Sequence, residues 1–146
     1  MAKRIIRIVL EVLSLLVLLG TIVFLMIYWK HIPDQVPTNY DGAGQISGWS
    51  GKKALLMQPL LMVVLYVTLS LAKTVRYRSL GRQVRLPAPL LFFPAMKLAM
   101  LSGLSYMAVC TALCRPLGVW FLPVFMAAIF LPMIVLFAIM LPHLRQ

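Results

Sequence analysis

Two ionisable residues, Glu11 and Lys97, stand within long apolar stretches of the sequence. A charged side chain inside a membrane span costs roughly 3 kcal/mol or more, so it usually has a partner. In the spans set out below, both residues lie about one to two helical turns in from the same membrane face. Since a helix rises about 1.5 Å per residue, their depths in the membrane are similar. An ion pair between them inside the membrane is one hypothesis. The other is that each side chain extends independently to the cytoplasmic interface.

Other residue types offer little for catalysis or metal binding. Glu11 is predicted inside, whereas Asp34 and Asp41 are predicted outside, and there is neither a His cluster nor a Ser/His/Asp set. His31 and His143 are predicted on opposite faces, so they cannot share a metal ion. Asn39 and Asp41 supply too few oxygen ligands for a calcium loop. Serines in apolar spans usually bond to their own helix; these are Ser14, Ser70, Ser102 and Ser105. We therefore expect no enzyme activity, no metal and no cofactor.

The two cysteines, Cys110 and Cys114, lie four residues apart in one apolar stretch. On a helix they would share a face. We interpret them as small apolar side chains that fill space. Their number and spacing indicate neither a disulfide framework nor a metal site.

The composition is typical of a membrane protein. The chain has 146 residues, of which 62% are hydrophobic and 12% charged, and its mean hydropathy is +0.96. A soluble domain is nearer half apolar, and so few charges cannot cover a globular surface. The formal net charge is +11. Because the basic residues cluster at the ends of apolar segments, we expect contact with anionic lipid headgroups and no nucleic-acid binding.

Four apolar segments are each long enough to cross a hydrocarbon core of roughly 30 Å. Backbone groups in lipid must be satisfied within the segment, so these segments are predicted to be helices. We expect an all-α membrane protein with four transmembrane helices and an ordered extracellular loop between the first and second. It would form one polytopic domain over residues 1–146. The expected spans cover about residues 8–28, 54–72, 90–114 and 117–141.

The distribution of Lys and Arg predicts the orientation of these spans. Nine basic residues lie on the side of the two termini: Lys3, Arg4, Arg7, Lys73, Arg76, Arg78, Arg82, Arg85 and Arg145. Four lie on the other side: Lys30, Lys52, Lys53 and Arg115. The side richer in Lys and Arg is cytoplasmic. Both termini are then expected in the cytoplasm.

Two features predict how the last spans pack. The third and fourth spans are joined only by Arg115 and Pro116, which indicates a tight antiparallel hairpin of helices. Small residues recur every four positions on the third span, at Ala95, Ala99 and Gly103. Such a stripe allows another helix to approach closely. We expect its partner within the same bundle, with a homodimer as the alternative.

The loop between the first two spans, residues 29–53, has the most informative composition. Two prolines fix backbone torsions, a turn dipeptide follows them, and two more glycines can adopt positive φ. These are Pro33, Pro37, Asp41-Gly42, Gly44 and Gly48. Three aromatic side chains suit the headgroup region: Trp29, Tyr40 and Trp49. We expect a short ordered cap. It is either a connector with interfacial anchors or, because it is longer than adjacent helices need, a recognition surface for a peptide, a lipid or a partner protein.

The segment from Ile32 to Lys52, just after the first span, carries a family signature. The pattern common in that family is roughly Leu-Pro-x-x-Ile-Pro-x-His-Phe-Asn, then Gly, then Asp-Gly-Trp, then Lys. The matching residues are Pro33, Pro37, Gly44, Gly48, Trp49 and Lys52. The segment resembles that of a bacterial membrane family of unassigned function. That family's domain also forms the N-terminal part of the immunity proteins against the sporulation-delaying protein toxin.

The sequence departs from this pattern at a few positions. Tyr40 and Asp41 stand where an aromatic residue and an Asn are usual. Asn39 stands where the family commonly has His, and Ser47 where it commonly has Asp. The resemblance covers about residues 8–72, and the last two spans are similar to the family only in being apolar.

The resemblance implies a protein of the bacterial inner (cell) membrane that binds a partner or protects the cell, as toxin-immunity proteins do, with signalling to a cytoplasmic partner as a further role. Its expected partners are the lipid bilayer and either a peptide toxin or a partner membrane protein. The loop residues expected to form the binding surface are Pro33, Pro37, Asn39, Tyr40, Asp41, Gly44, Trp49 and Lys52. The alternative is a small transporter, or an accessory subunit of a transport complex, in which Glu11 and Lys97 would line a water-filled path.

Overall fold

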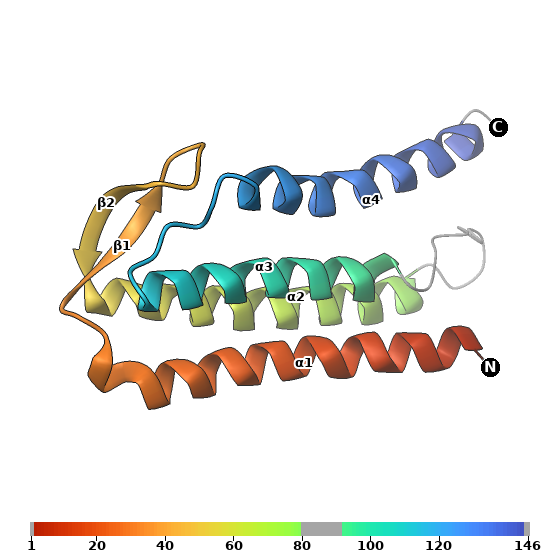
Figure 1. The fold of residues 1–146 in the computed structure, drawn as a ribbon. Helices are drawn as coiled ribbons and strands as arrows, with labels where there is room; N and C mark the ends of the chain where they lie inside the picture. The colour runs from red at the N-terminus through yellow and green to blue at the C-terminus, as the bar shows by residue number, and fades with distance from the viewer. Residues whose placement is uncertain (1, 80–91, 145–146) are drawn as a thin grey trace.

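Four long helices dominate the computed structural model, which describes residues 2–79 and 92–144 (Figure 1). They are α1 (Ala2–Tyr28), α2 (Met57–Ser79), α3 (Phe92–Ala112) and α4 (Phe121–Leu144). Two short 3-10 helices flank the α1–α2 connection: η1 (Trp29–His31) and η2 (Lys52–Leu56). All four expected helices are therefore present, although most of their ends differ by a few residues from the predicted bounds.

Three helices of the described chain are long and apolar enough to cross a membrane: Arg4–His31, Lys52–Leu71 and Phe92–Ala112. In α4, Phe121–Ile134 forms a shorter apolar helix. Large apolar side chains are exposed along the helices, for example Leu16 at 58% and Met26 at 72%. An apolar surface of this extent suits lipid as the surrounding solvent.

The two ends of the helix bundle differ. In Figure 1 the start of α1 and the end of α4 lie at one end of the molecule, and the connection between α1 and α2 lies at the other. Three basic residues that count toward the predicted orientation, Arg82, Arg85 and Arg145, lie outside the described residues.

The helix α3 is the centre of the bundle. It contacts α1, α2 and α4, whereas among the described helices α4 contacts only α3. The two helices approach closely at Gly103, where an added Cβ would lie 1.9 Å from the ring of Phe125 in α4. Ala95, eight residues earlier in the small-residue stripe, is exposed. The stripe therefore meets a helix of the same chain at its Gly103 end.

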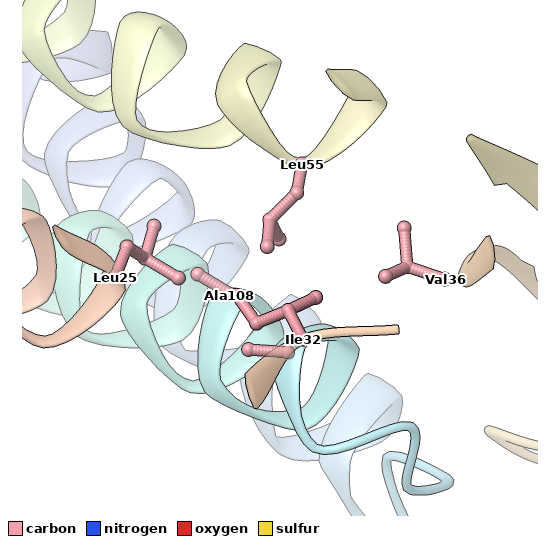
Figure 2. Close-up of a cluster of buried hydrophobic side chains, with 6 residues drawn as sticks. Leu25, Ile32, Val36, Leu55 and Ala108 are labelled. Carbon is pink, nitrogen blue, oxygen red and sulfur yellow. The ribbon is translucent and has the colours of Figure 1, made fainter. Parts of the chain in front are cut away.

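Two apolar clusters hold the helices together. One joins α1, α2 and α3 through Leu18, Met62 and Leu101, all at most 6% exposed. The other lies where the α1–α2 connection meets the bundle, and Figure 2 shows its side chains pointing toward one another. This second cluster consists of Leu25, Ile32, Val36, Leu55, Ala108 and Ala112. Apolar side chains from the connection thus bury themselves against helix ends.

The loop between α1 and α2 folds into a β-hairpin, so the described chain is mostly helical, as predicted, but it also contains a two-stranded sheet that the all-α prediction left out. Strand β1 (Gln35–Tyr40) pairs antiparallel with β2 (Ile46–Gly51), and Pro37 lies opposite Trp49. Two short runs with β-branched and aromatic residues flank Asp41-Gly42, which is a hairpin signal. From the sequence we predicted only a turn at this dipeptide, without the two strands. We call residues 29–56, which comprise η1, the hairpin and η2, the hairpin cap.

The connection between α3 and α4 spans residues 113–120, so the predicted two-residue link is also wrong. Cys114 has a φ of +53°, and the N–H of Arg115 donates to the carbonyl of Cys110 at 2.9 Å. This hydrogen bond closes the helix in the Schellman pattern. Cys114 therefore lies beyond the end of α3 and does not share a helical face with Cys110. Cys110 is buried and fills space in the bundle.

Candidate functional site

The turn of the hairpin is set by Asp41 and Gly44. Oδ1 of Asp41 accepts hydrogen bonds from the backbone N–H groups of Ala43 at 2.9 Å and Gln45 at 2.8 Å. The N–H of Gly44 donates to the carbonyl of Asp41 at 2.9 Å. Gly44 has a φ of +73°, which glycine adopts without steric cost. The carboxylate of Asp41 therefore holds the turn.

The turn also packs against the connection between α3 and α4. The N–H of Leu117 donates to the carbonyl of Gly44 at 2.9 Å. A Cβ at Gly44 would lie 2.5 Å from the carbonyl oxygen of Gly118, a distance that side chains do not tolerate. On the other side of this segment, the hydroxyl of Tyr106 in α3 donates to the carbonyl of Leu117 at 3.1 Å. Glycine at position 44 is thus required twice, by its torsion and by its neighbour.

Tyr40 joins β1 to the helices. Its hydroxyl and the fully buried Oγ1 of Thr111 in α3 share a hydrogen bond of 3.0 Å. Nε2 of Gln58 in α2 donates to the same oxygen at 3.5 Å, and Oε1 of Gln58 is buried without a hydrogen-bond partner among the described residues. Burial raises the pKa of Tyr40, and the hydrogen bond with Thr111 opposes that rise. One strand and two helices therefore meet at Thr111.

Lys52 closes the base of the hairpin cap. Its Nζ donates to the carbonyl of Ile32 at 2.9 Å and lies 4.8 Å from the ring centroid of Trp29. Its backbone N–H donates to the carbonyl of Asp34 at 2.8 Å. A cation over an aromatic face is attracted by the ring quadrupole. Lys52 thus ties the end of the hairpin to the segment that leaves α1.

The candidate binding residues of the loop divide by exposure. Four are buried or half-buried and contribute to the shape of the cap: Pro37, Tyr40, Gly44 and Lys52. Four are exposed: Pro33, Asn39, Asp41 and Trp49. Trp49 is 54% exposed, and Trp120 in the α3–α4 connection is 78% exposed. The cap therefore combines a fixed backbone with an exposed indole ring.

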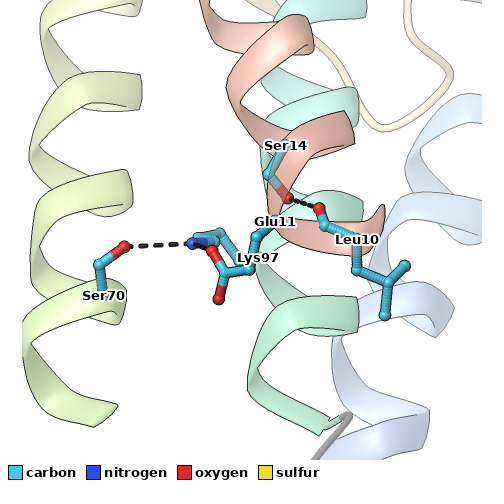
Figure 3. A network of polar contacts seen from close by, with 5 residues as sticks. All are labelled: Leu10, Glu11, Ser14, Ser70 and Lys97. Atoms are coloured by element: carbon cyan, nitrogen blue, oxygen red, sulfur yellow. Dashed lines mark hydrogen bonds and ion pairs between the residues drawn. The ribbon is translucent and has the colours of Figure 1, made fainter. Parts of the chain in front are cut away.

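A second site, the charged cluster, comprises Glu11, Tyr66, Ser70 and Lys97. Figure 3 shows Glu11, Ser70 and Lys97 of this cluster. Lys97 of α3 is 2% exposed and forms an ion pair with Glu11 of α1. Its Nζ donates to Oγ of Ser70 in α2 at 3.1 Å and lies 4.2 Å from the ring centroid of Tyr66. The structure thus brings together the two charges found in the sequence. The buried Lys97 does not extend to an interface.

Sequence reasoning missed Tyr66 and Ser70 as members of this cluster. Ser70 was expected only to bond to its own helix, and the structure shows that its Oγ accepts a hydrogen bond from Lys97. Ser105 accepts one from Thr21 of α1 at 2.7 Å. Two serines do donate to their own helix, as expected: Ser14 and Ser102. Because Tyr66 and Ser70 are four residues apart on α2, they share a face, and that spacing was the available signal.

Comparison with known proteins gives one family match. Residues 16–63, about a third of the chain, match the model of a family described as "Domain of unknown function (DUF1648)". Searches of curated proteins and of solved structures gave no match. The matched segment runs from within α1 through the hairpin to the first turns of α2. Over these residues, which include the whole hairpin cap, the chain is similar to a domain of unassigned function.

Proposed function

We propose that the chain is a four-span protein of the bacterial inner membrane, with both termini in the cytoplasm and the hairpin cap on the outer face. Two observations support this topology. The start of α1 and the end of α4 lie at the same end of the molecule, as an even number of crossings requires. The predicted cytoplasmic side carries nine Lys and Arg residues against four on the other.

Thiol labelling tests the topology. In a chain lacking Cys110 and Cys114, a membrane-impermeant maleimide added to intact cells should label Gln45→Cys and spare Ser79→Cys. After the cells are permeabilised, both positions should be labelled. Labelling of Ser79→Cys alone in intact cells would place the cap in the cytoplasm and reverse the proposal.

The function that we propose is recognition of a peptide toxin or a partner membrane protein by the outer hairpin cap, with protection of the cell as the consequence. The observation that carries it is the fixed position of the hairpin. Gly44, Tyr40 and Lys52 bind it to three separate segments, while Trp49 remains 54% exposed. A plain connector does not require such anchoring. A rigid backbone that presents an exposed Trp is typical of binding surfaces, where Trp often dominates affinity.

The protective role rests on the resemblance of the loop to the toxin-immunity proteins, through the spacing of Pro33, Pro37, Gly48 and Trp49. Signalling to a cytoplasmic partner would extend that role, with α1 and α3 as the route from the cap to the inner face. The homodimer is not needed for it, since Gly103 already packs against α4 of the same chain.

Expression in a toxin-sensitive bacterial host, followed by challenge with secreted peptide toxins, tests recognition and protection together. Cells with the wild-type chain should tolerate a higher concentration of at least one toxin than cells with an empty vector. Trp49→Ala should lower that tolerated concentration on the order of tenfold, because loss of a central Trp commonly costs more than 2 kcal/mol of binding.

Leu16→Ala is the matched control, because Leu16 is exposed to a similar degree, 58% against 54% for Trp49, but lies in the surface of α1 that we propose faces lipid. It should protect as well as the wild type at equal expression in the membrane. If the wild-type chain raises tolerance to none of the toxins, the protective role is wrong. If both variants lose protection equally, Trp49 has no special part in recognition.

The alternative function is transport, alone or as a subunit of a larger transporter, and the charged cluster favours it because ionisable groups in spans often line substrate paths. Two features weigh against it. Lys97 is only 2% exposed, and the apolar cluster of Leu18, Met62 and Leu101 lies farther along the same helices toward the cap. Ion flux through proteoliposomes that is lost in Lys97→Met would favour transport over binding.

A further inference from the structure

Three kinds of group surround the ammonium of Lys97. The carboxylate of Glu11 in α1 pairs with it, the hydroxyl of Ser70 in α2 accepts a hydrogen bond at 3.1 Å, and the ring of Tyr66 lies 4.2 Å away from centroid to Nζ. An opposite charge, a neutral acceptor and an aromatic face each favour a cation. All of them come from α1 and α2, whereas the lysine comes from α3.

We propose that α1 and α2 together form a binding site for a primary alkylammonium ion, and that Lys97 of α3 occupies this site as a tethered ligand. Under this proposal the selectivity of the site resides in Glu11, Ser70 and Tyr66. It does not depend on the covalent link to α3. A free amine of the right length should therefore bind when the lysine side chain is removed.

The geometry restricts the class of ligand. A primary ammonium has three N–H donors, which serve the carboxylate and the hydroxyl while its charge faces the ring. A quaternary ammonium has a charge but no donor, and an alcohol has a donor but no charge. Because Lys97 is 2% exposed, its alkyl stem is also enclosed by protein. The site should therefore take a short, straight alkyl chain that ends in –NH₃⁺.

The side chain of Glu11 is 25% exposed, in contrast to that of Lys97. The carboxylate end of the site is thus open to the surroundings of the bundle. We expect a small amine to reach the site by way of this partly exposed carboxylate. This makes the site accessible to ligand in the folded protein once the lysine stem is absent.

The test uses the full chain in detergent micelles with Lys97→Ala. This substitution removes three carbons and the nitrogen, so n-propylammonium is the matching probe. Its dissociation constant should be on the order of millimolar, since so small a ligand makes few contacts. At saturating probe, the thermal midpoint of Lys97→Ala should rise by about 2–4 °C. The wild type should not respond, because its site is full.

Three controls separate site binding from general effects. The neutral 1-propanol, at the same concentration, should give no comparable rise. N-propyltrimethylammonium should also fail, since it cannot donate. In Glu11→Gln/Lys97→Ala the response to n-propylammonium should disappear. Leu101→Ala, which opens an apolar cavity beside the neighbouring cluster, should not distinguish n-propylammonium from 1-propanol.

Equal rises with n-propylammonium and 1-propanol would mean that the probe only fills a cavity, and the proposal would be wrong. The same holds if Lys97→Ala is folded and does not respond. If Lys97→Ala does not fold without a ligand, the measurement becomes the yield of folded protein in membranes from cells grown with and without n-propylammonium. Recovery that requires Glu11 supports the site, and absence of recovery overturns it.

Discussion

The hairpin cap and the charged cluster are held in different ways. The cap depends on backbone geometry: a positive φ at Gly44, a turn closed by Asp41, and a hydrogen bond that the carbonyl of Gly44 accepts from the N–H of Leu117 in the α3–α4 connection. In the charged cluster, the contacts described above are between side chains, and they meet at the ammonium group of Lys97, which joins α1 and α2. The contacts of the hairpin cap are spread over several residues, whereas the contacts described for the charged cluster meet at Nζ of Lys97.

This difference predicts different responses to substitution. Loss of one contact in the cap leaves the others in place, so the effects should be modest and graded. Loss of one charge in the cluster removes the ion pair between Glu11 and Lys97, and the loss of a buried ion pair is costly in a low-dielectric medium. The comparison can be tested by free energies of unfolding of the full chain, measured by SDS titration in mixed micelles.

The largest effect is expected for the cluster. Lys97→Met should lower the free energy of unfolding by about 3 kcal/mol, because Glu11 keeps its charge without the ammonium. Glu11→Gln/Lys97→Met should recover part of this loss, with an interaction energy of about 0.5–3 kcal/mol. The exposed Lys53→Met should change stability by less than about 0.5 kcal/mol. Additive effects of the two cluster substitutions would mean that the charges act independently.

The next effect concerns the turn. Gly44→Ala should lower the free energy of unfolding by about 2 kcal/mol, because alanine resists a φ of +73° and its Cβ would meet the carbonyl of Gly118. Gly42→Ala, two residues earlier, is the matched control, since an added Cβ there has no heavy atom within 4 Å. Similar losses for the two variants would show that the contact with Gly118 contributes nothing.

A smaller effect is expected where β1 meets α3. Tyr40→Phe removes the hydroxyl that bonds to Thr111 and should cost about 1 kcal/mol. Tyr28→Phe is the control, because the hydroxyl of Tyr28 has no hydrogen-bond partner among the described residues. A loss as large in Tyr28→Phe would argue that Tyr40 is not an anchor.

The same contact predicts a pH dependence. Because burial raises the pKa of Tyr40 above its ordinary value of about 10, the folded state holds the phenolic proton more tightly than the unfolded state. The stabilisation from this proton is complete below about pH 10 and is lost as the pH rises through the folded pKa. Tyr40→Phe should abolish that part of the alkaline loss in an unfolding titration from pH 8 to 11.

The smallest effect is expected at the base of the cap. Lys52→Met should cost about 0.5–1 kcal/mol, since it removes the contact with Trp29 and the hydrogen bond to Ile32. The neighbouring Lys53→Met should have no measurable effect, because Lys53 is exposed. If the two variants are equally stable, Lys52 serves only as a surface charge.

The helices could be predicted because lipid leaves the backbone few choices. An apolar run long enough to cross the membrane must form a helix, so the runs around Leu18, Met62 and Leu101 were located from composition alone. The contact between Glu11 and Lys97 was one of two hypotheses, and it followed from the similar depths predicted for the two residues in the membrane. Because charged residues are rare in membrane spans, two of them at similar depth are good candidates for an ion pair.

The hairpin, and the hydrogen bonds that polar side chains make between helices, were harder to predict, for different reasons. Residues 35–51 are too short and too rich in glycine for a clear alternation of apolar and polar residues, so the strands were missed although Asp41 marked the turn. Ser70 and Thr111 carry hydroxyls that can bond either to their own helix or across the bundle. The packing of α2 and α3 decides which of these two kinds of hydrogen bond forms, and no pattern in the sequence predicts that packing.

The contact between the hairpin turn and the α3–α4 connection has a consequence for the order of synthesis. Gly44 leaves the ribosome 73 residues before Leu117, an interval of roughly 4–15 s at ordinary rates of translation. Throughout that time the hairpin lacks its last anchor, although α1 precedes it and α2 is completed 35 residues after Gly44, within the first half of the interval. Completion of the cap is therefore a late step in the synthesis of the protein, and chains truncated before Leu117 should be more sensitive to proteases at the turn than full-length chains.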